Sequence, residues 1–204
     1  LMPGAKPDAV QAMQGLISHA KNAGLSPEQA VDAALAPRER EAAVLYGKYQ
    51  QRLRTFNAVD FDDLIRLPVE LLERDEDCRL AWRERIGYLL VDECQDTNDA
   101  QYRFLKGLAG EQGHFTCVGD DDQSIYAWRG ANPENLSQLG KDYPALKIVK
   151  LEQNYRCSNR VLRAANALIA HNPHEHPKRL WSQQADGERI RILECRDDDH
   201  EAER

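Results

Sequence analysis

The amino-acid sequence predicts an α/β fold, because short apolar runs that end in polar residues alternate with helical stretches. The apolar runs cover residues 86–93, 115–123, 146–154 and 189–195. Residues 99–109 and 159–171, which lie between them, have helix-like compositions. Strands that alternate with helices form right-handed βαβ units and a parallel sheet. Ligands of such sheets bind at the carboxyl ends of the strands, so polar residues there are the first candidates for a functional site.

The N-terminal part of the chain predicts helices alone. Residues 9–58 are rich in Ala, Gln, Leu and Glu, which favour helix. The Ser-Pro pair at 26–27 is typical of an N-cap followed by a first helical turn. Residues 38–56 carry apolar side chains at helical spacing. A further helix is predicted over residues 62–74, with an interruption near Pro68.

The composition is that of an ordinary globular protein, with 42% hydrophobic and 30% charged residues among 204. No stretch approaches the roughly 18 apolar residues of a membrane helix, and the N-terminus lacks a signal-peptide pattern. These features predict a cytoplasmic protein without a membrane partner. The five cysteines form no C-x-x-C pair, which argues against disulfides and zinc sites. A net charge of −7 does not indicate nucleic-acid binding, although an acidic protein can bind DNA through a local groove.

Asp92 and Glu93 directly follow the first apolar run. Neighbouring residues at a strand end point to opposite sides, so these carboxylates would take different tasks. One can hold Mg²⁺, which prefers oxygen ligands, and the other can orient and deprotonate an attacking water. A strand end that is merely exposed to solvent is the alternative. Gln95 and Asp96 argue against it, because D-E-x-Q-D is far rarer than D-E.

The second apolar run continues into the polar loop VGDDDQSIYAWRGA. Its Gln123 is a neutral side chain suited to contact with a γ-phosphate or its attacking water. Tyr126, Trp128 and Arg129 follow in the same loop. Bases stack on aromatic rings, worth about 1–3 kcal/mol per base, and Arg adds a cation–π or phosphate contact. Packing of the two aromatic side chains inside the domain is the alternative.

Two further segments carry candidate residues. Tyr155 and Arg156 follow the third apolar run and precede a helical stretch. The guanidinium group of arginine can donate two hydrogen bonds to phosphate oxygens, and an aromatic ring beside it can stack on a nucleobase. Phe61 lies between acidic residues, which is an unusual place for a core aromatic. Ordinary packing remains the alternative for both segments, with Phe61 tucked inward in a capping segment.

Together, VDECQDTN, VGDDDQSIYAWRGA, LEQNYRCS and DFDDLI resemble the motifs of superfamily 1 DNA helicases of the UvrD, PcrA and Rep group, most closely its Rep members. The resemblance extends from about residue 15 to the end of the sequence. It implies two RecA-like domains with an ATP site in the cleft between them. It also implies a 3′→5′ helicase that hydrolyses ATP with Mg²⁺ and acts on single-stranded DNA and duplex junctions, with possible protein partners at the replication fork.

The resemblance implies roles at the nucleotide for residues that match the motifs. Asp92 would bind Mg²⁺, and Glu93 would be the general base for water attack. Gln123 would contact the γ-phosphate and couple the state of ATP to the grip on DNA. Tyr155 would stack near adenine. Arg156 would act as an arginine finger, which is worth about 10³–10⁵ in rate.

The resemblance also implies contacts with DNA. Tyr126 and Trp128 would meet single-stranded bases, Trp128 by stacking, with Arg129 beside them. Phe61 would be a further stacking residue. The sequence departs from the group at Cys94, where Tyr or Phe is usual, and we expect altered packing there rather than lost chemistry.

A phosphate-binding loop of the form G-x-x-x-x-G-K-[ST] is absent from the 204 residues. The Gly-Lys pairs at 47–48 and 140–141 are not followed by Ser or Thr. The group places this loop upstream of its helical insertion. We therefore expect an internal fragment, which by itself does not hydrolyse ATP.

The domains implied by the resemblance are three segments. Residues 1–57 would be a partial helical insertion of the first RecA-like domain. Residues 58–150 would be the C-terminal part of that domain, and residues 151–204 the start of the second. Two alternatives remain: the nuclease-linked branch of the same superfamily, and a non-catalytic module that binds single-stranded DNA or a protein partner through the YAWRG loop.

Overall fold

A computed structural model of the chain describes residues 2–111, 113–172 and 177–203, and for Arg129 it describes the backbone alone. The chain divides into two compact units, Leu1–Leu146 and Lys147–Arg204. The first unit contains helices and a small parallel sheet, so the prediction of a mixed α/β fold is confirmed. No helix in the described residues is both long and apolar enough to cross a membrane.

The first unit begins with the helices α1 (Pro7–Asn22), α2 (Pro27–Ala33) and α3 (Pro37–Thr55). The predicted start of α2 is confirmed, because the Ser26 side chain accepts a hydrogen bond from the backbone N–H of Gln29 at 3.2 Å. The apolar faces of the three helices meet in one cluster. Its buried members are Ile17, Ala30, Ala43 and Tyr46.

Buried ions join α1 to the next helix, α4 (Asp63–Arg74). The Lys21 side chain is 0% exposed and lies 2.6 Å from an Asp60 carboxylate oxygen and 3.1 Å from one of Asp63. Arg66 approaches the same Asp63 oxygen at 3.0 Å. A buried charge is tolerated only when it is paired, so these contacts fix how α1 and α4 pack.

The predicted interruption of α4 near Pro68 is wrong. The helix runs through Pro68 without a break. Proline removes one backbone hydrogen bond, but Val69 and Leu72 on the same helix are buried, and this packing outweighs the loss. A short turn then leads into α5 (Glu76–Ile86), which Asp75 caps by accepting from the backbone N–H of Cys78 at 2.8 Å.

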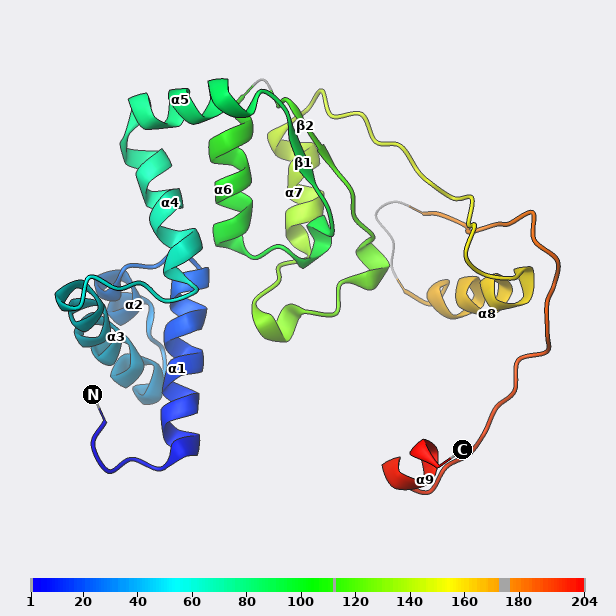
Figure 1. Cartoon of the computed structure of the whole chain (residues 1–204), viewed down its shortest axis with the longest axis horizontal. Helices are drawn as coiled ribbons and strands as arrows, with labels where there is room; N and C mark the ends of the chain where they lie inside the picture. The colour runs from blue at the N-terminus through cyan, green and yellow to red at the C-terminus, as the bar shows by residue number, and fades with distance from the viewer. Residues whose placement is uncertain (1, 112, 173–176, 204) are drawn as a thin grey trace. The chain divides into compact units, whose positions relative to one another are not determined.

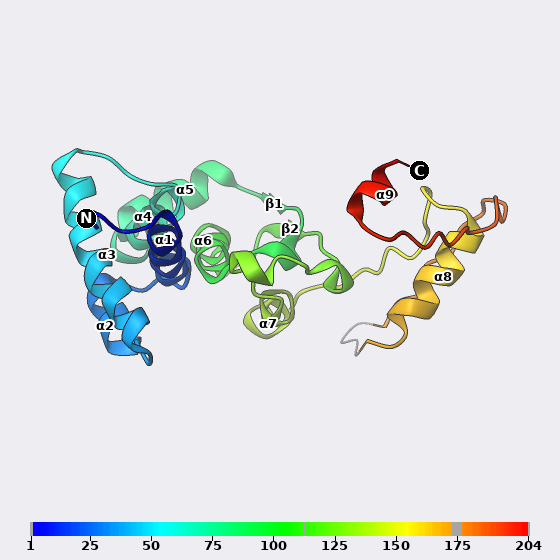
Figure 2. The ribbon, with the colours of Figure 1, turned by 90° about the horizontal axis from the view of Figure 1, so that it is seen from below.

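The sheet of the first unit consists of the parallel strands β1 (Leu89–Val91) and β2 (Phe115–Cys117). Leu89 pairs with Phe115, and Val91 pairs with Cys117. The connecting helix α6 (Asp99–Ala109) lies between the strand pair and the helices α1 and α4 (Figure 1; Figure 2). Helix α7 (Glu134–Asp142) closes the unit, and the core between these elements includes Cys94, Tyr102, Leu105, Phe115 and Leu139.

The second unit contains helices α8 (Asn159–Ile169) and α9 (Asp198–Ala202). The strands predicted over residues 146–154 and 189–195 do not form. In the described part of this unit the strand-like pairing is a single parallel bridge between Gln153 and Trp181. A strand needs a neighbour to satisfy its backbone hydrogen bonds, and without one the apolar side chains of both runs are exposed. The exposed side chains are Ile148, Val149, Leu151, Ile190, Ile192 and Leu193.

Candidate functional site

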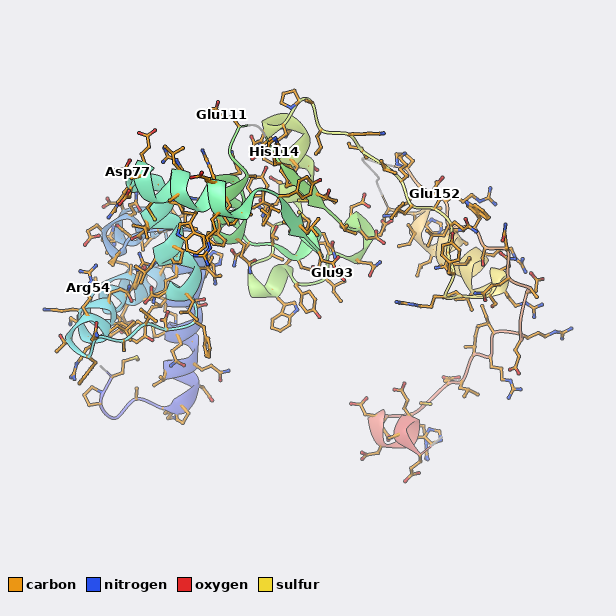
Figure 3. All side chains as sticks on the ribbon, turned by 45° about the horizontal axis from the view of Figure 1, so that its top comes forward. Arg54, Asp77, Glu93, Glu111, His114 and Glu152 are labelled. Carbon is orange, nitrogen blue, oxygen red and sulfur yellow. The ribbon has the colours of Figure 1, made fainter. Side chains whose placement is uncertain are left out.

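Asp92 and Glu93 lie at the carboxyl end of β1, as the sequence predicts. Figure 3 shows Glu93 at the opposite end of the strand pair from Glu111 and His114. Both carboxylates are exposed to solvent. The backbone N–H of Glu93 donates to Asp92 Oδ1 at 3.0 Å, which holds the two residues in a tight turn.

The turn places Glu93 in the left-handed region of the backbone, at φ 52° and ψ 43°. The two carboxylates therefore do not alternate between the faces of the sheet as neighbouring strand residues do. The strand β1 has already ended before them, at Val91. A non-glycine residue in such a conformation costs about 1–3 kcal/mol and persists only when its surroundings hold it. Here Cys94 supplies the anchor: its side chain is fully buried, and its N–H donates to Val118 O at 2.9 Å.

Gln95 connects the ends of the two strands. Its side chain is 1% exposed. Nε2 donates to Glu93 Oε2 at 2.8 Å, and Oε1 accepts from the backbone N–H of Asp120 at 3.0 Å. The motif D-E-x-Q-D alone does not predict this role for Gln95. The one signal for this role in the sequence is that residue 95 is a glutamine, because a side-chain amide can donate to a carboxylate while accepting from a backbone N–H.

The polar residues after β2 meet those after β1, because parallel strands end on the same edge of a sheet. Asp120 accepts from Gln123 Nε2 at 2.7 Å, and its carbonyl accepts from the Gln123 backbone N–H at 3.0 Å. These bonds accompany a turn of 3₁₀ helix, Asp121–Gln123. Glu93, Gln95, Asp120 and Gln123 thus form one hydrogen-bonded chain across both strand ends, which we term the strand-end chain.

Tyr126 and Trp128 lie in the loop that follows, around a second 3₁₀ turn, Ala127–Arg129. Their ring centroids are 6.4 Å apart with the planes tilted by 47°. Trp128 is 73% exposed, which does not support the alternative of packing inside the domain. The side chain of Arg129 lies outside the described part of the structure.

Asn132 and Asn135 fasten this loop to the residues after Glu93. The backbone N–H of Asn132 donates to Thr97 O at 2.9 Å, and Asn135 Nδ2 donates to the same oxygen at 3.0 Å. Asn135 is buried, so its amide depends on this bond for satisfaction. The loop with the exposed aromatics is therefore tied to the same strand end as the two carboxylates.

Phe61 is 89% exposed, so the alternative in which it tucks inward is wrong. It borders a cavity of about 480 Å³ beside α1. Its neighbour Asp62 accepts from Asn22 Nδ2 at 3.2 Å, and Asn22 Oδ1 accepts from Asn98 Nδ2 at 2.9 Å. Asn98 also caps α6. Side chains thus link the Phe61 segment to the end of VDECQDTN.

Tyr155 and Arg156 lie in the second unit, in a loop that leads into α8. Both side chains are exposed. Asn154 Oδ1 accepts from the backbone N–H groups of Arg156 at 2.9 Å and Cys157 at 2.7 Å, which closes an Asx turn. Gln184 Nε2 donates to Tyr155 O at 2.6 Å. The loop is shaped by these side chains rather than by a strand.

Two family models match this chain. The UvrD/REP helicase N-terminal domain matches residues 4–144, and the UvrD-like helicase C-terminal domain matches residues 149–204. The chain belongs to the UvrD/Rep helicase family. Domains of this family are RecA-like, so the predicted fold class is confirmed at that level as well.

Proteins similar to this member of the UvrD/Rep family carry helicase names. The ATP-dependent DNA helicase Rep of Escherichia coli (strain K12) is 52% identical over 195 residues, which are 96% of this chain and 29% of that protein. The Rep helicase of Salmonella typhimurium is 50% identical over the same shares. The ATP-dependent DNA helicase PcrA of Leuconostoc citreum is 43% identical over 92% of this chain and 25% of its own length. The chain therefore spans less than a third of these curated relatives.

The donor set at the end of β1 fits a magnesium ion with a polyphosphate. Asp92 offers an exposed carboxylate at the edge of the sheet where ligands of this fold class bind. In the described residues, Asp96 Oδ1 is buried without a hydrogen-bond partner, so a polar ligand or water is needed nearby. In the UvrD/Rep family member described here, Asp92 is the residue that would hold the ion.

Proposed function

We propose that this chain is part of an ATP-dependent DNA helicase that couples Mg–ATP hydrolysis to 3′→5′ movement along single-stranded DNA and to unwinding at duplex junctions. The strand-end chain carries this proposal: the Glu93 carboxylate after β1 is linked by hydrogen bonds, through Gln95 and Asp120, to Gln123 after β2. The names of the relatives support the same activity. The chain would act in the cytoplasm, with protein partners at the replication fork.

At the nucleotide, a bound magnesium ion would neutralise charge on the phosphates. Asp92 holds that ion, and Glu93 orients the attacking water and accepts its proton. Gln123 contacts the γ-phosphate, for which its amide leaves Asp120. Tyr155 stacks beside the adenine, and Arg156 supplies the arginine finger. The exposure of both side chains is compatible with contact to a ligand.

At the nucleic acid, Trp128 stacks on a base, with Tyr126 beside it and Arg129 next along the loop. Phe61 is a second stacking residue, which its exposure supports. The tie between Asn132 and Thr97 supports communication between this loop and the nucleotide residues Asp92 and Glu93, because both belong to the unit Leu1–Leu146.

The domain organisation is part of the proposal. Residues 1–57 form part of the helical insertion, residues 58–150 the C-terminal part of the first RecA-like domain, and residues 151–204 the start of the second. The 204 residues contain no phosphate-binding loop. We therefore propose that they do not hydrolyse ATP by themselves, and Mg²⁺-dependent turnover by this chain alone would overturn that point.

The test is Glu93→Gln in the full-length protein. We expect DNA-stimulated ATP hydrolysis to fall by about 10²–10⁴-fold, since a general base is lost, with single-strand affinity retained. Glu111→Gln is the matched control, because Glu111 is exposed at the opposite end of the strands and its loss should leave the rate unchanged. Hydrolysis that survives Glu93→Gln would refute the assignment. A protein that binds single strands and never hydrolyses ATP would be the non-catalytic module instead.

A further inference from the structure

Gln95 has two side-chain partners that belong to different strand ends. We propose that Gln95 is a positioning residue for hydrolysis: it orients the Glu93 carboxylate and ties it to the loop that carries Gln123. The inference rests on the proposed function, because it assigns Glu93 as the base. It adds a residue that does not touch the reacting atoms.

The orientation of the Gln95 amide is dictated by the backbone. The peptide N–H of Asp120 can only donate, so the atom facing it at 3.0 Å must be the amide oxygen. The amide nitrogen therefore faces Glu93 Oε2 at 2.8 Å and donates to it. This bond holds the Glu93 carboxylate in one orientation. The backbone just after β2 thus determines, through one side chain, where the Glu93 carboxylate lies.

Burial gives this arrangement its strength. The Gln95 side chain is 1% exposed, so water does not compete for its donor or its acceptor. The backbone carbonyl of Gln95 also accepts from the Ser124 hydroxyl at 3.3 Å, which adds a second tie to the loop after β2. Glu93 itself is exposed and has a left-handed backbone, so it needs such a fixed neighbour to hold one geometry.

Gly119 leaves the space that this contact requires. A Cβ atom on Gly119 would lie 3.0 Å from Gln95 Oε1 and 3.4 Å from the Gln95 backbone nitrogen. The need for glycine here is one of close approach between the strand ends. A side chain at 119 would therefore push the amide away from its partners without changing the chemical type of any polar residue.

The base and the phosphate contact share an anchor through Asp120. Its backbone N–H holds Gln95, and its carboxylate accepts from Gln123 Nε2. When Gln123 turns from Asp120 to a phosphate, Gln95 still fixes the backbone of Asp120 relative to Glu93. Gln95 consequently sets the separation between the residue that activates water and the residue that contacts the phosphate.

Gln95→Glu in the full-length protein tests the proposal. The substitution is nearly isosteric and keeps an acceptor for the Asp120 N–H, but it replaces the donor to Glu93 with a second carboxylate. Two carboxylates at this distance repel each other, so the Glu93 side chain should leave the position in which Gln95 holds it. We expect kcat for ATP to fall by up to about 100-fold with KM little changed.

Gln101→Glu is the matched control. Gln101 Oε1 accepts from the backbone N–H of Asn98 in the capping box of α6, and a glutamate supplies the same acceptor. This variant introduces the same charge a few residues away, and we expect its kcat and KM to stay as in the parent protein. A similar loss in both variants would show a general charge effect and overturn the proposal.

Gly119→Ala provides a second route if Gln95→Glu does not fold, as judged by circular dichroism and thermal melting. We expect it to lower kcat with KM little changed, because the amide is displaced but not replaced. An unchanged kcat in Gln95→Glu overturns the role of Gln95, and so does an unchanged kcat in Gly119→Ala if Gln95→Glu does not fold. If Glu93→Gln abolishes hydrolysis in the same assay while the Gln95 variant does not lower kcat, the proposed function is retained and only the role of Gln95 is refuted. If Glu93→Gln retains hydrolysis, the proposed function itself is refuted.

Discussion

In the unit Leu1–Leu146, the candidate carboxylates follow a strand that pairs with a neighbour, and a buried amide ties the two strand ends together. In the unit Lys147–Arg204, Tyr155 and Arg156 follow an apolar run that forms no strand in the described residues. Their loop is instead closed by Asn154 and by Gln184. The difference shows that a polar loop can be shaped either by a sheet beneath it or by side chains that satisfy its own backbone.

Burial separates the two units in the same way. The first contains two apolar clusters and a buried ion network around Lys21. Among the described residues of the second, Leu162 is the one buried side chain. Long-range packing therefore determines the geometry of the first unit, whereas capping bonds determine that of the second. Each of the following predictions tests one side of this contrast.

The largest expected effect belongs to the second unit. Arg156→Ala in the full-length protein should reduce ATP hydrolysis by about 10³–10⁵-fold, because an arginine finger stabilises charge in the transition state. Folding should be unaffected, since the side chain is exposed. Steady-state hydrolysis is the measurement, and Arg196→Ala, an exposed arginine of the same unit, is the control. Equal rates in the two variants would contradict the role of Arg156.

The next effect is on stability and belongs to the first unit. Lys21→Met should lower the free energy of opening α1 and α4 by about 3–5 kcal/mol, because it leaves the buried Asp63 short of a partner. Amide hydrogen exchange in the full-length protein measures this locally. The matched change is Arg163→Met, which removes an exposed ion pair with Asp186 and should have little effect on α8. Similar losses in both would remove the contrast between the units.

Trp128→Ala should weaken binding of single-stranded DNA by about 1–3 kcal/mol, the value of one base stacked on an aromatic ring. Fluorescence anisotropy with a labelled oligonucleotide is a suitable measurement. Trp82→Ala is the control, because Trp82 is also partly exposed but lies on α5, away from the loop. An unchanged affinity in Trp128→Ala would show that this loop does not contact bases.

A smaller effect is expected for Asn154→Ala. The substitution removes the acceptor for the backbone N–H groups of Arg156 and Cys157. Each lost hydrogen bond is worth about 1 kcal/mol, so exchange of these amides should accelerate roughly fivefold. Asn98→Ala removes a comparable cap in the first unit, where packing of α6 should limit the loss to its first turn. Exchange unchanged in Asn154→Ala would mean that something else shapes the loop.

The smallest effect is a response to acid. Burial opposes ionisation of Asp60, but the hydrogen bond and charge of Lys21, together with the hydrogen bond from the Asp63 backbone N–H, outweigh it and lower the pKa of Asp60 below its ordinary 3.8. A carboxyl whose pKa is lowered by folding adds stability above its unfolded pKa, and that stability is lost as the pH falls through the folded value. Amide exchange in α1 should therefore accelerate below about pH 3.8 relative to Lys21→Met, in which this pH dependence should be weaker. Parallel pH profiles would argue against the pairing.

The sequence alone located the elements whose signals are local. The Ser26 cap, the long helix α3 and the helix α6 were predicted because caps and helical spacing act within a few residues. Strands at 89–91 and 115–117 were also predicted, and they form because each supplies the partner that the other needs. The runs at 146–154 and 189–195 carry the same pattern and form no strand, because pairing is not a property of one segment.

The same distinction between local signals and tertiary packing applies to the candidate site residues. The rule that polar residues gather at the carboxyl ends of parallel strands was sufficient to group Asp92, Glu93 and Gln123. The left-handed backbone of Glu93 and the burial of Gln95 could not be read from the sequence, because both depend on how closely β2 approaches β1. Helix, cap and motif are set by neighbours along the chain. The orientation of the Glu93 carboxylate is set by one buried amide, that of Gln95, whose partners lie at two different strand ends.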